Sequence, residues 1–132
     1  MENNKIFFIA DDDPDDQELF IEALKGIDKF CKCVTAFNGQ EALHILLKGM
    51  LTLPDFIFLD LNMPRMNGKQ CLAEIKKDRT LQNIPVIIYS TSSDKKDIEE
   101  TMQLGAVFFF QKPSRFDELS QALYQIINRS WK

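Results

Sequence analysis

Apolar residues gather in five short runs along the chain, with longer mixed stretches between them. The runs cover residues 6–10, 31–36, 55–59, 86–89 and 107–110. They are largely continuous and do not alternate with polar residues, which is typical of parallel strands that are covered on both faces. The pattern therefore predicts five buried strands.

The stretches between and after these runs carry apolar residues at three- and four-residue steps, which predicts helices. Asp13 and Pro14 are typical of an N-cap and a first helical position, and Gly105 is typical of a helix end. The expected helices cover about residues 14–26, 38–49, 69–77, 94–104 and 115–129. Strands that alternate with helices in this way predict an α/β domain whose parallel sheet has helices on both faces.

Composition narrows the class of protein. A chain of 132 residues fits one domain, so we expect a single domain over residues 1–132 with no output domain. The net charge of -4 argues against direct nucleic-acid binding. Three cysteines form no even disulfide framework, and no apolar segment suits a signal peptide or a membrane span. We therefore expect a soluble cytoplasmic protein.

Polar residues directly follow four of the five runs. Asp11 and Asp12 follow the first, Asp60 the third, Ser90 the fourth and Lys112 the fifth. The carboxyl ends of parallel strands meet at one edge of a sheet, where open α/β sheets build their sites. The sequence thus predicts three carboxylates, a hydroxyl and an ammonium group close together.

This set of groups suits phosphoryl transfer to an aspartate. A carboxylate can accept a phosphoryl group, but cations must neutralise the mutual repulsion. Mg²⁺ prefers oxygen ligands, so Asp11 and Asp12 are expected to hold it beside Asp60. Lys112 and Ser90 are expected to meet the phosphoryl oxygens with a positive charge and a hydroxyl donor.

Four motifs closely resemble the receiver domain of two-component response regulators. They are Asp11-Asp12, the segment Leu59–Pro64 with Gly68, Ser90, and Lys112-Pro113, in the family's order and spacing. The resemblance covers nearly the whole chain. It implies a flavodoxin-like (βα)5 fold with strand order 2-1-3-4-5, in a single-domain protein similar to the chemotaxis regulators.

By the same resemblance, Asp60 is the phosphoacceptor and Asn62 a Mg²⁺ ligand through its backbone carbonyl. Ser90 stands at the switch hydroxyl and Phe109 at the aromatic switch position, where phenylalanine lacks the hydroxyl of a tyrosine. The bond between Lys112 and Pro113 is often cis in this family.

The resemblance implies a switch more than an enzyme. Its partners would be a sensor histidine kinase or a histidine phosphotransfer protein, together with a downstream protein; oligomeric state stays open. A phosphorelay intermediate is not separated from a terminal switch. Two rivals are an aspartate-nucleophile phosphohydrolase, which typically has a second aspartate where this chain has Asn62, and an interaction scaffold that is not phosphorylated.

The remaining acidic residues of the first helix have a simpler explanation. Asp13, Asp15 and Asp16 lie at the expected helix start, where carboxylates cap the backbone and favour the helix dipole. We therefore assign them to capping and not to the site. Trp131, near the end of the chain, receives no assigned function.

Overall fold

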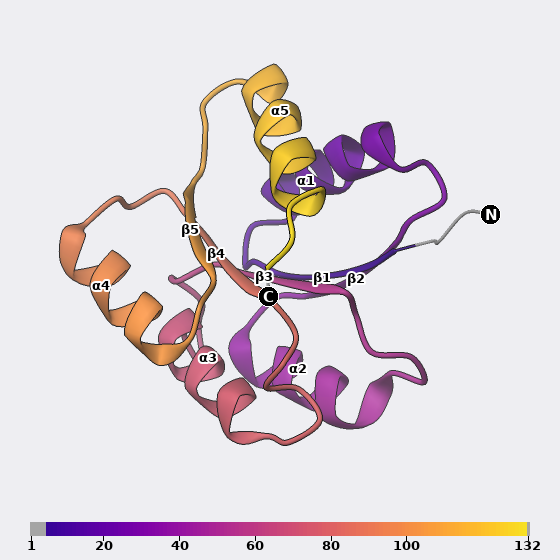
Figure 1. The fold of residues 1–132 in the computed structure, drawn as a ribbon. Coiled ribbons are helices and arrows are strands. Elements are labelled where there is room, and N and C mark those ends of the chain that lie inside the picture. Colours follow the sequence, from indigo (N-terminus) through magenta and orange to yellow (C-terminus); the bar gives the residue numbers. More distant parts are fainter. Residues whose placement is uncertain (1–4, 132) are drawn as a thin grey trace.

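A five-stranded parallel sheet forms the centre of the computed structural model, which describes residues 5–131 (Figure 1). The strand order is β2-β1-β3-β4-β5, so the expected flavodoxin-like order is confirmed. Every neighbouring pair is parallel. The strands are β1 (Ile6–Ala10), β2 (Lys32–Ala36), β3 (Phe56–Leu59), β4 (Val86–Ser90) and β5 (Phe108–Gln111).

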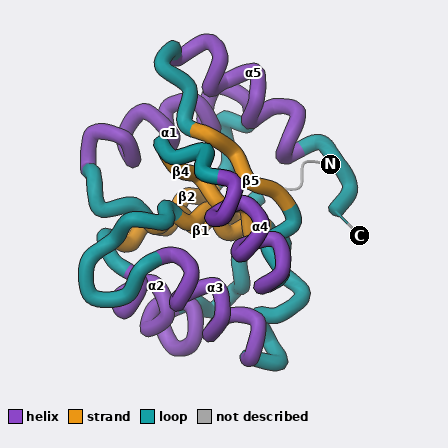
Figure 2. Tube along the Cα trace, turned by 90° about the vertical axis from the view of Figure 1, so that its left-hand side faces the viewer, coloured by secondary structure: helices purple, strands orange, loops and turns teal. Residues whose placement is uncertain are grey.

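Helices cover both faces of the sheet. Figures 1 and 2 show α1 and α5 together on one face, and α2, α3 and α4 on the other. The expected helix over residues 38–49 ends in a π-helical turn, η1, a difference that apolar spacing alone does not reveal. The helical segments are α1 (Pro14–Ile27), α2 (Gly39–His44), η1 (Ile45–Gly49), α3 (Gly68–Lys77), α4 (Lys95–Leu104) and α5 (Phe116–Ile127).

The two faces of the sheet have different cores. The core under α1 and α5 is rich in aromatic rings, and Phe20 contacts both Phe58 and Tyr89 edge-on with centroids 4.8 and 4.7 Å apart. The core under α2 and α3 is mostly aliphatic. Because helices cover both faces of the sheet, β3 and β4 are buried along their whole length. This explains their continuous apolar sequences.

Local signals place the helix starts as expected. The Asp13 carboxylate caps α1 by accepting hydrogen bonds from the backbone N–H groups of Asp15 (2.9 Å) and Asp16 (3.4 Å). Asn67 and Gln70 form a capping box at the start of α3. Gly105 ends α4 with φ of 113°, a left-handed conformation that favours glycine.

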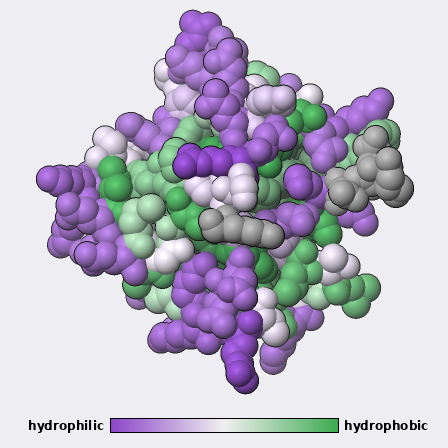
Figure 3. Space-filling view, in the orientation of Figure 1, coloured by the Kyte–Doolittle hydropathy of each residue, from purple (hydrophilic) through white to green (hydrophobic). Residues whose placement is uncertain are grey.

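Several expectations from the sequence can be compared with the described residues 5–131. All three cysteines are free. None of the helices within residues 5–131 has the length and apolar character needed to cross a bilayer. The surface in Figure 3 shows hydrophilic groups projecting around scattered apolar ones. The expectation of no signal peptide also concerns residues 1–4, which lie outside the described residues.

Two features near the carboxyl end of the chain were not expected from the sequence. The bond between Lys112 and Pro113 is trans, like every other peptide bond among residues 5–131, so the cis expectation is wrong. The trans isomer is intrinsically favoured before proline by about 0.5–1 kcal/mol. Trp131, which received no role from the sequence, packs on Phe108 and donates a hydrogen bond from Nε1 to the Ile126 carbonyl (2.9 Å).

Candidate functional site

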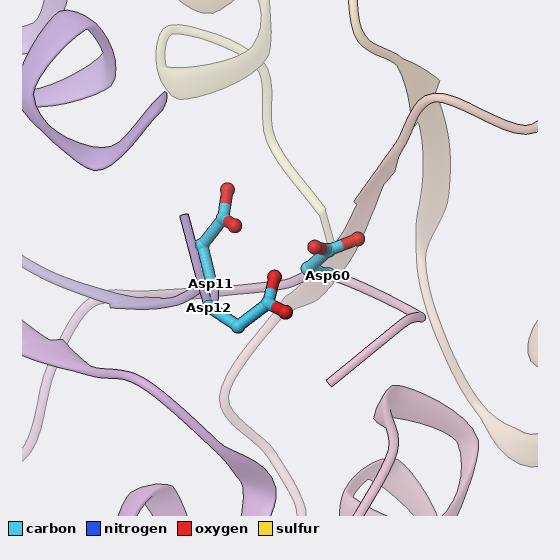
Figure 4. A group of neighbouring side chains, drawn as sticks. All are labelled: Asp11, Asp12 and Asp60. Atoms are coloured by element: carbon cyan, nitrogen blue, oxygen red, sulfur yellow. The ribbon is translucent and has the colours of Figure 1, made fainter. Parts of the chain in front are cut away.

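Three carboxylates come together where β1 and β3 end. Asp11 and Asp12 follow β1, and Asp60 follows β3 (Figure 4). One carboxylate oxygen from each of the three residues lies within 4.8 Å of the other two. The two strands are neighbours, and the Asp60 backbone N–H donates to the Ala10 carbonyl (2.9 Å). Asp11 and Asp60 are buried, whereas Asp12 is exposed. The sheet thus places the three predicted carboxylates at one spot.

Lys112 brings a positive charge to this cluster from the end of β5. Its Nζ lies 3.0 Å from Asp11 Oδ2, 2.9 Å from Asp16 Oδ2 and 3.7 Å from Asp60 Oδ2. The Lys112 backbone N–H donates to the Ser90 carbonyl (2.7 Å), which extends the β4–β5 pairing by one step. Its side chain is only 9% exposed. The predicted ammonium group is therefore in place, although its two shortest contacts are not to Asp60.

Burial and charge act against each other at this site. Burial raises the pKa of Asp60 to about 6, even though Lys112 lowers it and the Asp11 charge raises it further. Burial also disfavours the charged form of Lys112, but the hydrogen bonds to Asp16 and Asp11 outweigh this and raise its pKa. The cluster is short of positive charge, which a divalent cation can supply.

The structure corrects the role that the sequence assigned to Asp16. Its backbone N–H takes part in the helix cap, but its carboxylate lies on Lys112 and is a member of the charged cluster. Tyr89, which received no role, supports the same lysine: Nζ lies 5.0 Å from the centre of its ring. Neither contact follows from sequence spacing, because each depends on how α1, β4 and β5 pack together.

Gln17 is a second residue that sequence reasoning missed. Its buried side-chain amide donates to the backbone carbonyls of Asp11 (2.9 Å) and Ala36 (2.7 Å), and so fixes the backbone of Asp11 beside β2. A signal was present, because Gln17 interrupts the apolar face that continues with Phe20 and Leu24. A polar residue on a buried helix face needs a hydrogen-bonding partner.

The loop after β3 holds Asp60 in place. The start of α3 lies against it, because Gly68 N–H donates to the Leu61 carbonyl (2.9 Å) and a side chain at Gly68 would overlap the Asp60 carbonyl oxygen. Asn62 is exposed, and its backbone N–H lies 3.4 Å from Asp60 Oδ1. Glycine at position 68 therefore lets the helix approach the central carboxylate closely.

Ser90 and Phe109 lie on the same face of the sheet, toward α2, α3 and α4. Phe109 is paired in register with Ile88, which lies two residues before Ser90, and it packs half-buried against the aliphatic core. Ser90 is fully buried, and its Oγ accepts a hydrogen bond from Ser92 N–H (3.1 Å). Both predicted switch residues are thus close to α4, and the hydroxyl is engaged within the loop that follows β4.

This arrangement of an acidic cluster, a lysine and a hydroxyl on a five-stranded sheet matches a known family. A family model for the response regulator receiver domain matches residues 7–124. The chain belongs to this family. Receiver domains are signalling modules of two-component systems, and histidine kinases or phosphotransfer proteins phosphorylate them.

Curated relatives of this receiver domain are longer proteins. It is 35% identical over 118 residues to the probable C4-dicarboxylate response regulator DctR of Bacillus subtilis, covering 87% of this chain and 49% of the relative. It is also 35% identical over 131 residues to a protein-glutamate methylesterase/protein-glutamine glutaminase of Clostridium acetobutylicum, covering 98% and 36%. The receiver domain thus spans about half or less of these relatives.

Solved structures agree with the fold. The phosphorylated cyanobacterial phytochrome response regulator RcpA matches with a TM-score of 0.87 and 34% identity, over 94% of this chain and 91% of that one. The Mn²⁺-bound form of response regulator Rcp1 matches with a TM-score of 0.83 and 27% identity, over 92% and 91%. The receiver fold is therefore shared along nearly the whole chain.

Proposed function

We propose that this receiver domain accepts a phosphoryl group on Asp60 and signals through the protein surface that then changes. The observation that carries the proposal is the position of the Asp60 carboxylate. It is buried beside Asp11 and Asp12, with the Lys112 ammonium 3.7 Å away. A carboxylate can accept a phosphoryl group where cations neutralise its repulsion from the donor, and Lys112 supplies one such charge beside Asp60.

The donor would be a phosphohistidine of a kinase or of a phosphotransfer protein. An Asp60 oxygen forms a bond to phosphorus while the phosphorus–nitrogen bond of the donor breaks, and the freed histidine takes up a proton. The raised pKa of Asp60 shows that burial works against its charged form. Positive charge at the site is therefore needed both to ionise the nucleophile and to accept the phosphoryl group.

The acidic cluster fits a Mg²⁺ ion. Its three hard oxygen donors lie within 4.8 Å of one another, and Asp12 is exposed, so the site is open to solvent. We assign Asp11, Asp12 and Asp60 as carboxylate ligands and the Asn62 backbone carbonyl as a further ligand. When bound, the ion supplies the charge that lets a phosphate-bearing donor approach Asp60. The related response regulator Rcp1 has been solved in a Mn²⁺-bound form, which supports binding of a divalent cation.

Ser90 and Phe109 would report the modification. The phosphoryl oxygens are strong acceptors, so the Ser90 O–H would donate to one of them, and the hydroxyl would shift toward the phosphoryl group. That hydroxyl now accepts from Ser92 N–H, and Ser92 Oγ lies 3.4 Å from the Asp97 carboxylate on α4. A displacement of the Ser90 side chain would be transmitted to α4 along these contacts. The Phe109 ring would then fill the space beside Ser90.

Two alternatives are less well supported. An aspartate-nucleophile phosphohydrolase typically uses a second aspartate two residues after the nucleophile as acid/base, and the amide of Asn62 does not act as an acid or a base at neutral pH. A scaffold without phosphorylation would not need Asp60 and Lys112 in a buried cluster. A phosphorelay intermediate uses the same chemistry, so passage of the label from Asp60 to a phosphotransfer domain would distinguish it from a terminal switch.

The test is phosphorylation of the purified protein with Mg²⁺ and a small phosphodonor. We expect a mass increase of one phosphoryl group that is stable in acid and lost in base, as for an acyl phosphate. Asp60→Asn should remove the adduct. Asp55→Asn, at the opposite end of the same strand, should retain it. An adduct that survives in Asp60→Asn would show that the proposed function is wrong.

A further inference from the structure

A fourth carboxylate, Asp16, lies at the site and belongs to none of the expected roles. Asp16 Oδ2 is 2.9 Å from Lys112 Nζ, the shortest of the three contacts that this ammonium makes to carboxylates. The Asp16 side chain comes from the first turn of α1 and is 35% exposed. It therefore reaches Lys112 from the solvent side, whereas Asp11 and Asp60 reach it from the sheet.

We propose that Asp16 is a positioning residue that holds Lys112 in the unphosphorylated state and competes with the phosphoryl group for it. The inference rests on the proposed function, because it concerns the same lysine and the same acceptor. In this arrangement Asp16 sets how strongly the site retains a phosphoryl group. Loss of its charge makes phosphorylation of Asp60 more favourable.

The hydrogen-bonding capacity of Lys112 explains the competition. An ammonium has three N–H donors, and the contacts to Asp11 and Asp16 occupy two of them. At 3.7 Å the Asp60 contact is too long for a strong hydrogen bond. In the proposed competition the third N–H is free to donate to a phosphoryl oxygen, but the ammonium charge is shared with Asp11 and Asp16, and Nζ turns away from one of them as it turns toward the phosphoryl group.

Asp16 is the partner best able to release the lysine. Asp11 is buried and is needed on the metal side of the cluster, and Asp60 carries the phosphoryl group. Asp16 borders an open hollow of about 340 Å³, lined also by Leu19, Thr91 and Phe116. Its carboxylate can turn into this hollow and be solvated there, so release requires no unpaired buried charge.

The test compares two neighbouring acids in the same helical turn. Asp16→Asn removes the charge on Lys112, and Asp15→Asn removes an equal charge from an exposed residue outside the described ion pairs of Lys112. With Mg²⁺ present, binding of beryllium trifluoride, a mimic of the phosphoryl group, is measured by titration. We expect Asp16→Asn to tighten binding about three- to tenfold and Asp15→Asn by less than about twofold. Equal effects of the two substitutions, or weaker binding by Asp16→Asn, would overturn the proposal.

Two further measurements separate the possible failures. In a Lys112→Met background the effect of Asp16→Asn should disappear, since the two residues act as a pair; an undiminished effect would show that Asp16 acts as a distant charge. A crystal structure with beryllium trifluoride should show Lys112 Nζ on a fluoride and no longer on Asp16, and a retained ion pair would contradict the proposal. Wild-type protein that binds no beryllium trifluoride would instead argue against phosphorylation at Asp60 itself.

Discussion

Site residues on the two faces of the sheet differ in the number of contacts that hold their side chains in place. On the side of α1 and α5, Lys112 is surrounded by Asp11, Asp16 and the Tyr89 ring. On the opposite side, the one hydrogen bond of the Ser90 hydroxyl to residues 5–131 is accepted from the loop N–H of Ser92. On the first face, several contacts hold the charged groups of the site in one position. On the second face, fewer hydrogen bonds must break before the Ser90 side chain can move.

The helices differ in the same way. Both α1 and α5 bury several residues each in the aromatic core, including Phe20 and Leu123. In α4 only Thr101 is fully buried, while Met102 and Leu104 are exposed. Ion pairs from Lys69 on α3 to Asp97 (2.6 Å) and Glu100 (2.5 Å) supply part of its attachment. Segments with few buried apolar groups open at the lowest cost in free energy.

This difference suits a switch. A phosphorylation site must hold its catalytic groups in one geometry, because a small displacement is costly for the reaction. The element that reports the reaction must instead have two arrangements of similar free energy. The sheet separates these demands, since Lys112 and Ser90 lie at the ends of adjacent strands but engage opposite faces.

The largest expected effect on stability follows from removal of the Lys112 charge on the face covered by α1 and α5. Lys112→Met leaves Asp11, Asp16 and Asp60 without their cation, and loss of one partner of a buried ion pair typically costs about 3 kcal/mol. Urea denaturation in EDTA should show this loss of unfolding free energy, and Mg²⁺ should restore part of it. Lys77→Met, which breaks an exposed pair with Glu74, should cost about 0.5 kcal/mol or less.

A second substitution tests whether the backbone at Asp60 is fixed. Gly68→Ala places a methyl group where the Asp60 carbonyl oxygen lies, so α3 or the Asp60 loop must move. We expect a loss of about 2 kcal/mol, the range of overpacking, together with slower phosphorylation. Gly26→Ala in α1 meets no atom within 4 Å and should stabilise the protein by up to about 1 kcal/mol. Equal stabilities of the two variants would contradict a close approach at Gly68.

The pH dependence of stability tests the burial of Asp60. Its pKa is raised to about 6 in the folded protein from 3.8, so the folded state binds the proton more tightly than the unfolded state. The resulting stabilisation is complete below about pH 4 and is lost as pH rises through about pH 6, a change of about 2 kcal/mol or less.

Thermal unfolding in EDTA across this window measures the effect. Asp60→Asn should flatten the profile between about pH 4 and pH 6 and should be the more stable protein at neutral pH, because it has no buried charge to ionise. A wild-type profile with the same slope as that of Asp60→Asn would show that Asp60 titrates like an exposed aspartate.

Much of the fold could be predicted from continuous apolar runs, since strands such as Phe56–Leu59 are buried on both faces. The helix start at Asp13 also followed from local chemistry, whereas the capping box at Asn67 was not predicted. The strand order came from the family resemblance, and four of the expected site residues, Asp11, Asp12, Asp60 and Lys112, are close together as predicted. Local rules suffice where one element determines the outcome.

Contacts between elements were beyond reach. The sequence pattern favoured helix capping for Asp16, and only the packing of α1 on the sheet shows that its carboxylate meets Lys112. Tyr89 lies in a run of apolar residues and looks like ordinary core until its ring is found beneath the same lysine. Such side chains are selected by geometry across distant segments, which spacing along one segment does not encode.

The smallest expected effect concerns the loosely held α4. Lys69→Met removes the ion pairs to Asp97 and Glu100, and partly exposed pairs of this kind are worth about 0.5 kcal/mol. Global stability should change little, but amide hydrogen exchange in α4 should become about twofold faster, because that energy acts on local opening. The amides of α1 should be unaffected, and Lys77→Met should change neither helix. Equal exchange rates of the α1 and α4 amides in the wild-type protein, or equal acceleration of both in Lys69→Met, would contradict the comparison. The two helices would then open at similar cost in free energy, and an element other than α4 would have to report phosphorylation.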